Sequence, residues 1–308
     1  MSTTPVSNIL HRTLNKRDKL NILCFFFDGR FEDVLVKTGH NIYGAENSFI
    51  SNCDRNPNLR YLPDNISQVE QDMCWDLILY NHEESQFNNA RKMSAILHVP
   101  ALRVEHFLSA TNIPTEITED TVFSHSVVKN SYKADGEIIR YGIEDSGESE
   151  EERDIDVLIH GNFIPSDYQA VRFIEGLDYN VEVWGDSPGL SEQISNEDLV
   201  SKLKKTKVFI NLSTQGGVPY SALVAMMSGC AIISNKTEAT EGVFTDDFAI
   251  LVKTLEDFDV SLNHILSTDW KNMGKAARKV ALENFNIETN AKLWDKKLRQ
   301  KSEEVYIR

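Results

Sequence analysis

The sequence predicts an α/β protein with two Rossmann-like domains that face one another across a cleft. Three observations support this fold class. The chain has 308 residues, whereas a single core stops growing at about 250 residues. Short apolar runs alternate with segments of helical pattern, as in doubly wound sheets. The stretch DSGESEEERD has no apolar side chain, so we place an acidic linker at 146–153, between domains at 1–145 and 154–308.

In the first domain, the run LNILCFFF at 20–27 is too short for a helix core and predicts a buried parallel strand. A short helix is expected next, at 30–38. Apolar runs then predict further strands, separated by a helix at 84–97, and these strands lie at 76–81, 101–106, 121–126 and 137–143.

The same alternation restarts after the linker. Strands are predicted at 155–162, 179–185, 208–213, 230–234 and 248–252. Helices are predicted near 167–177, at 196–206 with Asn196 as N-cap, and from about 219, followed by two long C-terminal helices. These last helices are candidates to cross back to the first domain.

Composition limits the partners of the chain. The net charge of -15 opposes nonspecific attraction to nucleic acid or anionic lipid. No run approaches the roughly 20 apolar residues that cross a bilayer, and the N-terminal stretch lacks the apolar run of a signal peptide. The 4 cysteines show no C-x-x-C spacing, which favours reduced thiols. We therefore expect a cytoplasmic monomer or small homo-oligomer, without membrane attachment.

The richest segment is KVFINLSTQGGVPYSALVAMMSGCAIIS, at 207–234, which predicts strand, glycine-rich loop, helix and strand. Ligands of open α/β sheets collect at the carboxyl ends of strands. The glycines allow the backbone to approach a ligand closely, and the free amides of the first helical turn can donate to the oxygens of a diphosphate. A glycine-rich connection without a ligand is equally compatible with the spacing. The candidate residues here are Ser213, Gly216, Gly217, Pro219, Tyr220 and Ser221.

A second segment, IDVLIHGNFIPSDYQAVRF, ends a predicted strand at His160, Gly161 and Asn162 and places Arg172 on a helix. Arg172 could pair bidentately with phosphate oxygens if its helix faces the cleft. The alternative is a solvated surface arginine.

Residues 154–290 resemble the donor domain of GT-B glycosyltransferases of the glycogen-synthase-like and spore-maturation-like group. The shared order includes a strand with Gly-Asn and a downstream Arg, a strand ending in Trp184, Gly185 and Asp186, and GGVPYSALVAMMSGCAIIS. The last stretch is similar to the family's EGFG…LEAMA.G.PVI signature. The family's two motif glutamates fall on Gly216 and Val224 here, so a binding protein without catalytic activity is an open alternative.

The resemblance implies that the donor substrate is a nucleoside-diphosphate sugar, which we expect to be a UDP-sugar. It implies no further cofactor. Its diphosphate would be held by Arg172 and the amides after Gly217. It also implies transfer of a hexosyl or pentosyl group to a hydroxyl, with retention at the anomeric carbon. No D-x-D stands at a strand end, so we predict metal-independent transfer without a metal site.

Acceptor-side candidates follow two apolar strands of the first domain. A histidine beside carboxylates can orient a hydroxyl or accept its proton near neutral pH. The catalytic candidates are His82, Glu83, Glu105 and His106, each of which could instead be a hydrogen-bonding loop residue.

The first half is similar to glycosyltransferases of large tailed bacteriophages in the runs KTGHNIY, LILYNHEE and VEH. That similarity makes a hydroxymethylated pyrimidine in phage DNA the leading acceptor, which would place the protein in the host cytoplasm. Competing hypotheses are a glycan or small-molecule acceptor, a noncatalytic nucleotide-sugar sensor and an interaction scaffold. The chain has no GxSxG, HExxH, GxxxxGK[ST] or GxGxxG after the first strand, so hydrolase, zincin, P-loop and simple dehydrogenase functions lack support.

Overall fold

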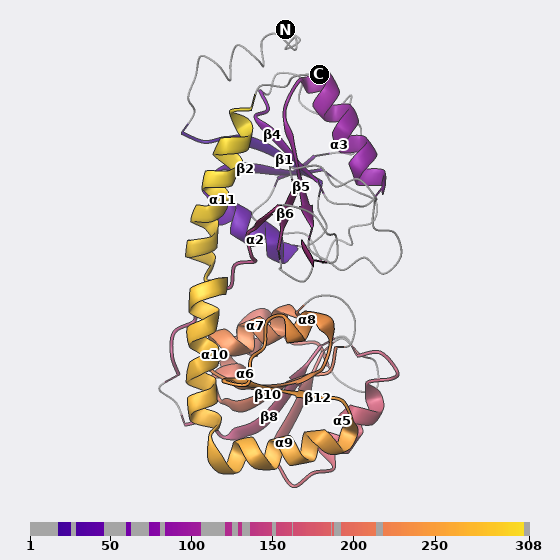
Figure 1. The fold of residues 1–308 in the computed structure, drawn as a ribbon, viewed down its shortest axis with the longest axis vertical. Helices are drawn as coiled ribbons and strands as arrows, with labels where there is room; N and C mark the ends of the chain where they lie inside the picture. The colour runs from indigo at the N-terminus through magenta and orange to yellow at the C-terminus, as the bar shows by residue number, and fades with distance from the viewer. Residues whose placement is uncertain are drawn as a thin grey trace. The chain divides into compact units, whose positions relative to one another are not determined.

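The computed structural model describes residues 18–25, 29–45, 60–62, 74–80, 84–105, 121–124, 129–130, 136–149, 152–161, 163–185, 187, 192–213 and 218–304. The chain forms two units (Figure 1). The first unit comprises Met1–His106, Ala110–Gly142 and Ile287–Arg308, and the second comprises Phe107–Ser109 and Ile143–Asn286.

The first unit contains a parallel sheet in the order β3-β2-β1-β4-β5-β6-β7. The chain adds strands toward one edge of the sheet from β1 to β3 and toward the other edge from β4 to β7. This change of direction between β1 and β4 is the arrangement of a doubly wound fold. Two of its strands, β2 and β3, were not predicted, because β2 contains Asn and Gly, which are depleted in strands, and β3 has 3 residues. The strands are β1 Asn21–Phe25, β2 Asn41–Ala45, β3 Arg60–Leu62, β4 Leu77–Tyr80, β5 Ala101–Glu105, β6 Thr121–Phe123 and β7 Glu137–Ile138.

Helices cover both faces of the first sheet. On one face, α2 (Gly29–Lys37) and α11 (Ile287–Ser302) share a buried apolar cluster with β1, β4 and β5. On the other face, α3 (Glu84–Leu97) packs in a separate cluster around Trp75. Figure 1 shows α11 and α2 on the side of the sheet opposite to α3.

The second unit contains a parallel sheet in the order β12-β11-β10-β8-β9. This is the flavodoxin-like order, with its switch point between the first and third strands of the unit, β8 and β10. The strands are β8 Ile155–His160, β9 Val181–Trp184, β10 Thr206–Asn211, β11 Ala231–Asn235 and β12 Ala249–Val252.

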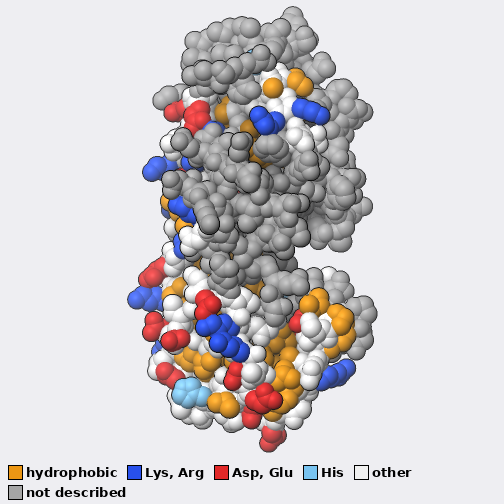
Figure 2. Space-filling model, turned by 45° about the vertical axis from the view of Figure 1, so that its right-hand side comes forward, with side chains coloured by type: hydrophobic (Ala, Val, Ile, Leu, Met, Phe, Trp, Pro, Cys, Tyr) orange, Lys and Arg blue, Asp and Glu red, His pale blue; other side chains and the backbone are white. Residues whose placement is uncertain are grey.

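Alternating side chains of the second sheet pack into two clusters, one on each face. The first cluster involves α6 (Asn196–Lys204), α7 (Tyr220–Met227) and α10 (Trp270–Phe285), and the second involves α5 (Tyr168–Glu175) and α9 (Leu255–Thr268). A short helix, α8 (Glu238–Glu241), follows β11. The face of this unit visible in the lower half of Figure 2 carries basic side chains next to acidic ones.

The C-terminal helix belongs to the first unit, which corrects the predicted second domain of 154–308 and agrees with the expected crossing back. Trp294 of α11 is fully buried and lies edge-to-face against Phe31 of α2, with ring centroids 5.0 Å apart. A buried aromatic pair of this geometry adds about 0.5–1.5 kcal/mol beyond area burial. The pattern of α11 therefore reflects a partner that lies about 260 residues away along the chain.

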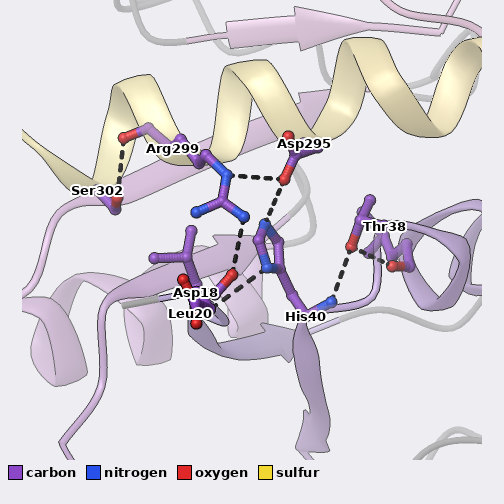
Figure 3. Close-up of polar contacts among 8 residues, drawn as sticks. Asp18, Leu20, Thr38, His40, Asp295, Arg299 and Ser302 are labelled. Atoms are coloured by element: carbon purple, nitrogen blue, oxygen red, sulfur yellow. Dashed lines mark hydrogen bonds and ion pairs between the residues drawn. The ribbon is translucent and has the colours of Figure 1, made fainter. Parts of the chain in front are cut away.

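A polar cluster joins α11 to the beginnings of β1 and β2 (Figure 3). The Leu20 amide donates to His40 Nδ1 at 3.3 Å, and His40 Nε2 lies 3.0 Å from Asp295. Arg299 bonds both Asp295 and the Asp18 carbonyl. Burial and then the Arg299 charge lower the pKa of His40, although Asp295 opposes them, so the neutral imidazole is the form that this cluster stabilises.

Other boundaries differ from the prediction in detail. The chain passes from the first unit to the second between Gly142 and Ile143. The described part of the acidic stretch belongs to the second unit, in which Asp145 pairs with Arg278 at 2.7 Å. Ser195, whose hydroxyl accepts from the Asp198 amide, is the N-cap of α6 in place of Asn196. Three helices, α9, α10 and α11, follow β12 where two were predicted, because Asp269 and Asn286 interrupt the helical run.

Cys24 in β1 and Cys230 just before β11 are buried and free, in agreement with the reduced thiols expected from the cysteine spacing. Burial raises the pKa of the Cys230 thiol to about 11, despite the nearby Arg153, so this thiol stays protonated and unreactive near neutral pH. Among the described residues, no helix is long and apolar enough to cross a membrane.

Candidate functional site

The candidate site lies at the carboxyl edge of the second sheet. His160 ends β8 and Asn211 ends β10, the two strands that flank the switch point. Parallel sheets of this order bind ligands outside the carboxyl ends of the strands at that point. His160, Gly161, Gly185 and Ser213, which were selected from the sequence, therefore lie at the edge where a ligand of this fold would bind.

Two predicted residues, Gly161 and Gly185, are in direct backbone contact. The Gly161 amide donates to the Trp184 carbonyl at 3.2 Å. Gly185 has a φ of 153°, and a Cβ placed on it would lie 1.9 Å from the Gly161 carbonyl oxygen. No side chain fits at Gly185, so the close approach of the loops after β8 and β9 requires glycine at this position.

Neutral polar side chains connect the ends of β10 and β11. The Asn211 side chain donates to Ser234 Oγ at 2.8 Å and accepts from the Ser213 amide at 3.1 Å. The Asn235 side chain donates to the Leu212 carbonyl at 2.6 Å. Asn211 and Ser234 are buried, so the network fixes the backbone that leads to Ser213.

Sequence reasoning missed these three network residues, Asn211, Ser234 and Asn235. Their signal is a polar side chain at the end of an otherwise apolar strand, as in VFIN and AIISN. Ser187 is a further omission, because its hydroxyl accepts from the Phe163 amide at 2.9 Å and so links the segments after β8 and β9.

Helix α7 begins at Tyr220, with Pro219 as its N-cap in an extended conformation. The predicted amides of Tyr220 and Ser221 lie in its first turn. The Ala222 amide, which we also expected to face a phosphate, instead donates to the Pro219 carbonyl at 3.0 Å. Val224, on a motif glutamate position, is buried in the apolar cluster of α7 and α10, an environment that suits valine and would penalise an unpaired carboxylate.

Arg172 lies in the last turn of α5. Its side chain is 65% exposed, and Nη1 lies 3.2 Å from the Glu175 carboxylate. An exposed arginine beside a carboxylate on its own helix retains mobility to reach a ligand. Its predicted role at the diphosphate stays a prediction.

The described residues cover part of the predicted site. In the second unit Asn162, Asp186, Gly216 and Gly217 lie outside them, and in the first unit His82, Glu83 and His106 do. His82 and Glu83 follow β4, one of the two strands at the switch point of the first sheet. Glu105 ends β5, where it is fully buried and pairs with the buried Arg103, an arrangement that fits a structural ion pair better than acceptor contact.

Known proteins resemble this chain in sequence over its second half and in fold over nearly all of it. Residues 149–295 match the model of a family described as glycosyl transferase-like. HepE of Anabaena, solved in complex with UDP-glucose, superposes with a TM-score of 0.72 at 10% identity, covering 91% of this chain and 100% of that one. The chain has the GT-B fold.

Other GT-B proteins of similar length agree with this assignment. A glycosyltransferase from Rickettsia africae superposes with a TM-score of 0.70 at 12% identity, over 94% of this chain and 100% of that one. Sucrose-phosphate synthase from Thermosynechococcus elongatus gives 0.64 at 13% identity, over 92% and 99%. Curated protein sequences show no match. The fold class predicted from the sequence is therefore confirmed, while these identities leave the substrates open.

Proposed function

We propose that this GT-B protein is a glycosyltransferase that takes its sugar from a UDP-sugar bound at the carboxyl edge of the second sheet. The observation that carries the proposal is the match of residues 149–295, almost the whole second unit, to a glycosyl transferase-like family. HepE, a protein of the same fold, was solved with UDP-glucose and with UDP. The contact of Gly161 and Gly185 supports the same site, because it brings the loops after β8 and β9 together at the edge where ligands of this fold bind.

In the proposed mechanism, the second unit stabilises the departing diphosphate. The amides of Tyr220 and Ser221 at the positive end of α7 would donate to its oxygens, and Arg172 would supply a full charge. Preorganised donors act most strongly on charge that develops as the leaving group departs. Asn211 and Ser234 act indirectly, by fixing the backbone before the glycine-rich loop.

The first test is thermal stabilisation by UDP, GDP, ADP and their sugars, because a ligand that binds only the folded state raises the melting temperature. We expect UDP and a UDP-sugar to give the largest rise. Arg172→Ala should weaken UDP binding severalfold, whereas Lys204→Ala on α6 serves as a charge-matched control. No rise with any nucleotide would overturn the proposed site.

Transfer itself is tested by release of UDP in the presence of acceptors. The leading acceptor that we propose is a hydroxymethylated pyrimidine in DNA, and oligosaccharides form the comparison panel. Release that depends on hydroxymethylated DNA, but not on unmodified DNA, would support this acceptor. UDP-sugar binding without release in any reaction would favour a noncatalytic nucleotide-sugar-binding protein.

Two finer properties are proposed for the transfer. We expect retention at the anomeric carbon, visible as an unchanged anomeric configuration in the NMR spectrum of the product. We also expect metal-independent transfer, so that EDTA leaves the rate unchanged. Loss of activity in EDTA that Mg²⁺ or Mn²⁺ restores would contradict the second expectation.

A further inference from the structure

A polar cavity lies at the opposite, amino edge of the sheet in the second unit. Its volume is about 460 Å³, within the range of small-molecule sites. Arg153 precedes β8, Lys207 lies in the first part of β10 and Gly229 precedes β11, while α10 forms the remaining wall with Trp270, Gly274 and Arg278. The cavity is therefore separated from the candidate donor site by the length of the strands.

Basic side chains dominate this cavity, although the chain as a whole carries a net charge of -15. The visible face of the second unit mixes basic with acidic side chains (Figure 2). In contrast, five cationic residues line the cavity against two carboxylates, Glu148 and Glu152. The five are Arg153, Lys207, Lys271, Lys275 and Arg278.

Three of these cations are already engaged by the protein. Arg153 donates to backbone carbonyls that include Ser228, Lys207 lies 2.7 Å from Asp156, and Arg278 lies 2.7 Å from Asp145. Lys271 and Lys275 project from successive turns of α10, and neither forms an ion pair with any residue that the structure describes. Lys271 lies over the Trp270 ring, with Nζ 5.4 Å from its centroid, and the ammonium groups of both lysines can still donate to an anion.

Two buried donors beside the cavity lack hydrogen-bond partners among the described residues. They are the Ser228 hydroxyl and Arg278 Nε, and both residues line the cavity. Ser228 is 1% exposed and Arg278 is 8% exposed. A carboxylate oxygen of the exposed Glu148 lies 3.9 Å from Arg278 Nε. Because buried polar groups are normally paired, two unpaired donors next to a basic cavity indicate a missing acceptor.

We propose that this cavity binds a small phosphorylated molecule. Phosphate oxygens would accept from Lys271 and Lys275 at the mouth and, after small side-chain rotations, from Ser228 and Arg278 within. Trp270 is half-buried in the wall, where Lys271 Nζ lies 5.4 Å and Arg153 Cζ 6.0 Å from the centroid of its ring, so the ring helps to hold these two cations at the cavity. This site is independent of the proposed donor site and of glycosyl transfer.

Titration calorimetry at constant ionic strength tests the proposal, with glucose 6-phosphate, pyrophosphate and inorganic phosphate as probes, and the lysine variants distinguish binding at this cavity from binding at the donor site. Lys271→Ala/Lys275→Ala should weaken binding of the best probe by about tenfold or more. Lys292→Ala/Lys296→Ala on α11 removes the same charges at the same helical spacing from exposed positions, and should change it less than about twofold. Tighter binding of glucose 6-phosphate than of phosphate would identify an organic ligand; the reverse order would identify the inorganic ion.

Ser228→Ala provides a test that does not depend on net charge. Without a ligand, removal of an unpaired buried hydroxyl should leave the melting temperature unchanged or raise it. The rise in melting temperature caused by the probe should become smaller in the same variant. Absence of binding by all three probes, or equal losses in the two lysine variants, would overturn the proposal.

Discussion

The two edges of the second sheet hold their polar groups in different ways. At the carboxyl edge, Gly161 and Gly185 meet through backbone and the side chains of Asn211 and Ser234 are neutral and bonded to each other. At the amino edge, charged side chains such as Arg153 dominate. The first edge is thus defined by shape and the second by charge.

This difference predicts different responses to salt and to substitution. Screening at about 1 M ionic strength reduces the Debye length to about 3 Å and weakens exposed charge interactions. Close backbone contacts do not depend on charge. Binding at the carboxyl edge should therefore weaken less with added salt than binding at the amino edge. The effects of substitutions should likewise depend less on salt at the carboxyl edge than at the amino edge.

The largest effect is expected at Gly185. In Gly185→Ala the new Cβ would meet the Gly161 carbonyl oxygen at 1.9 Å, so the loops after β8 and β9 must separate. We expect a loss of about 3 kcal/mol in the free energy of unfolding, together with loss of UDP-induced stabilisation. Chemical denaturation with and without UDP measures both quantities.

Gly147→Ala is the control for backbone strain alone. Gly147 has a φ of 80°, but a Cβ there would meet nothing within 4 Å. A left-handed alanine costs about 1–2 kcal/mol, and UDP binding should persist. If both variants lose the same stability, the contact between Gly161 and Gly185 does not define the carboxyl edge.

This glycine contact also shows how far sequence reasoning reaches. Gly161 and Gly185 could be selected individually, because each follows an apolar strand at the edge where ligands bind. Their mutual contact could not be predicted, since it depends on the pairing of β8 with β9. Strand β8 and helix α3 could also be predicted, because the pattern of apolar residues within a short stretch of sequence indicates a strand or a helix.

Long-range packing explains what the sequence did not predict. Trp294 and Ala291 give α11 an apolar stripe, but the sequence alone does not indicate which of the two sheets this stripe packs against. The amino-edge cavity was missed because its lysines and arginines come from distant segments, and separately each resembles a solvated surface residue. Only the folded chain brings them together.

The next largest effect is expected at Arg153, on the amino edge. Its guanidinium donates to the carbonyls of Leu203, Thr206 and Ser228, which lie on three segments around the edge. Arg153→Ala should destabilise the protein by about 2–3 kcal/mol, because these bonds involve a charged donor. Arg153→Lys keeps the charge but not the planar fork, so an equal loss in this variant would show that geometry is what matters; full recovery would show that charge suffices.

A smaller loss is expected at Asn211, on the carboxyl edge. Asn211→Ala removes the bond to Ser234 Oγ and the bond from the Ser213 amide, at a cost of about 1–2 kcal/mol. The melting temperature should fall by the same amount at low and high salt, because the bonds are neutral. A salt-dependent difference from wild type would contradict the distinction between the two edges.

The smallest effect is expected at Asp156, whose carboxylate lies 2.7 Å from Lys207 Nζ and accepts from the Asn180 amide at 3.0 Å. Partial burial raises the pKa of Asp156, but the bonds from Lys207 and Asn180 outweigh it, and the pKa is lowered overall. Stability from this carboxylate is therefore fully present above its unfolded pKa, about 3.9, and is lost as the pH falls through the folded value. Asp156→Asn should cost about 0.5–1 kcal/mol at pH 7, and this difference should shrink both in acid and at high salt. A loss that persists in both conditions would mean that shape, as at the carboxyl edge, also governs this position.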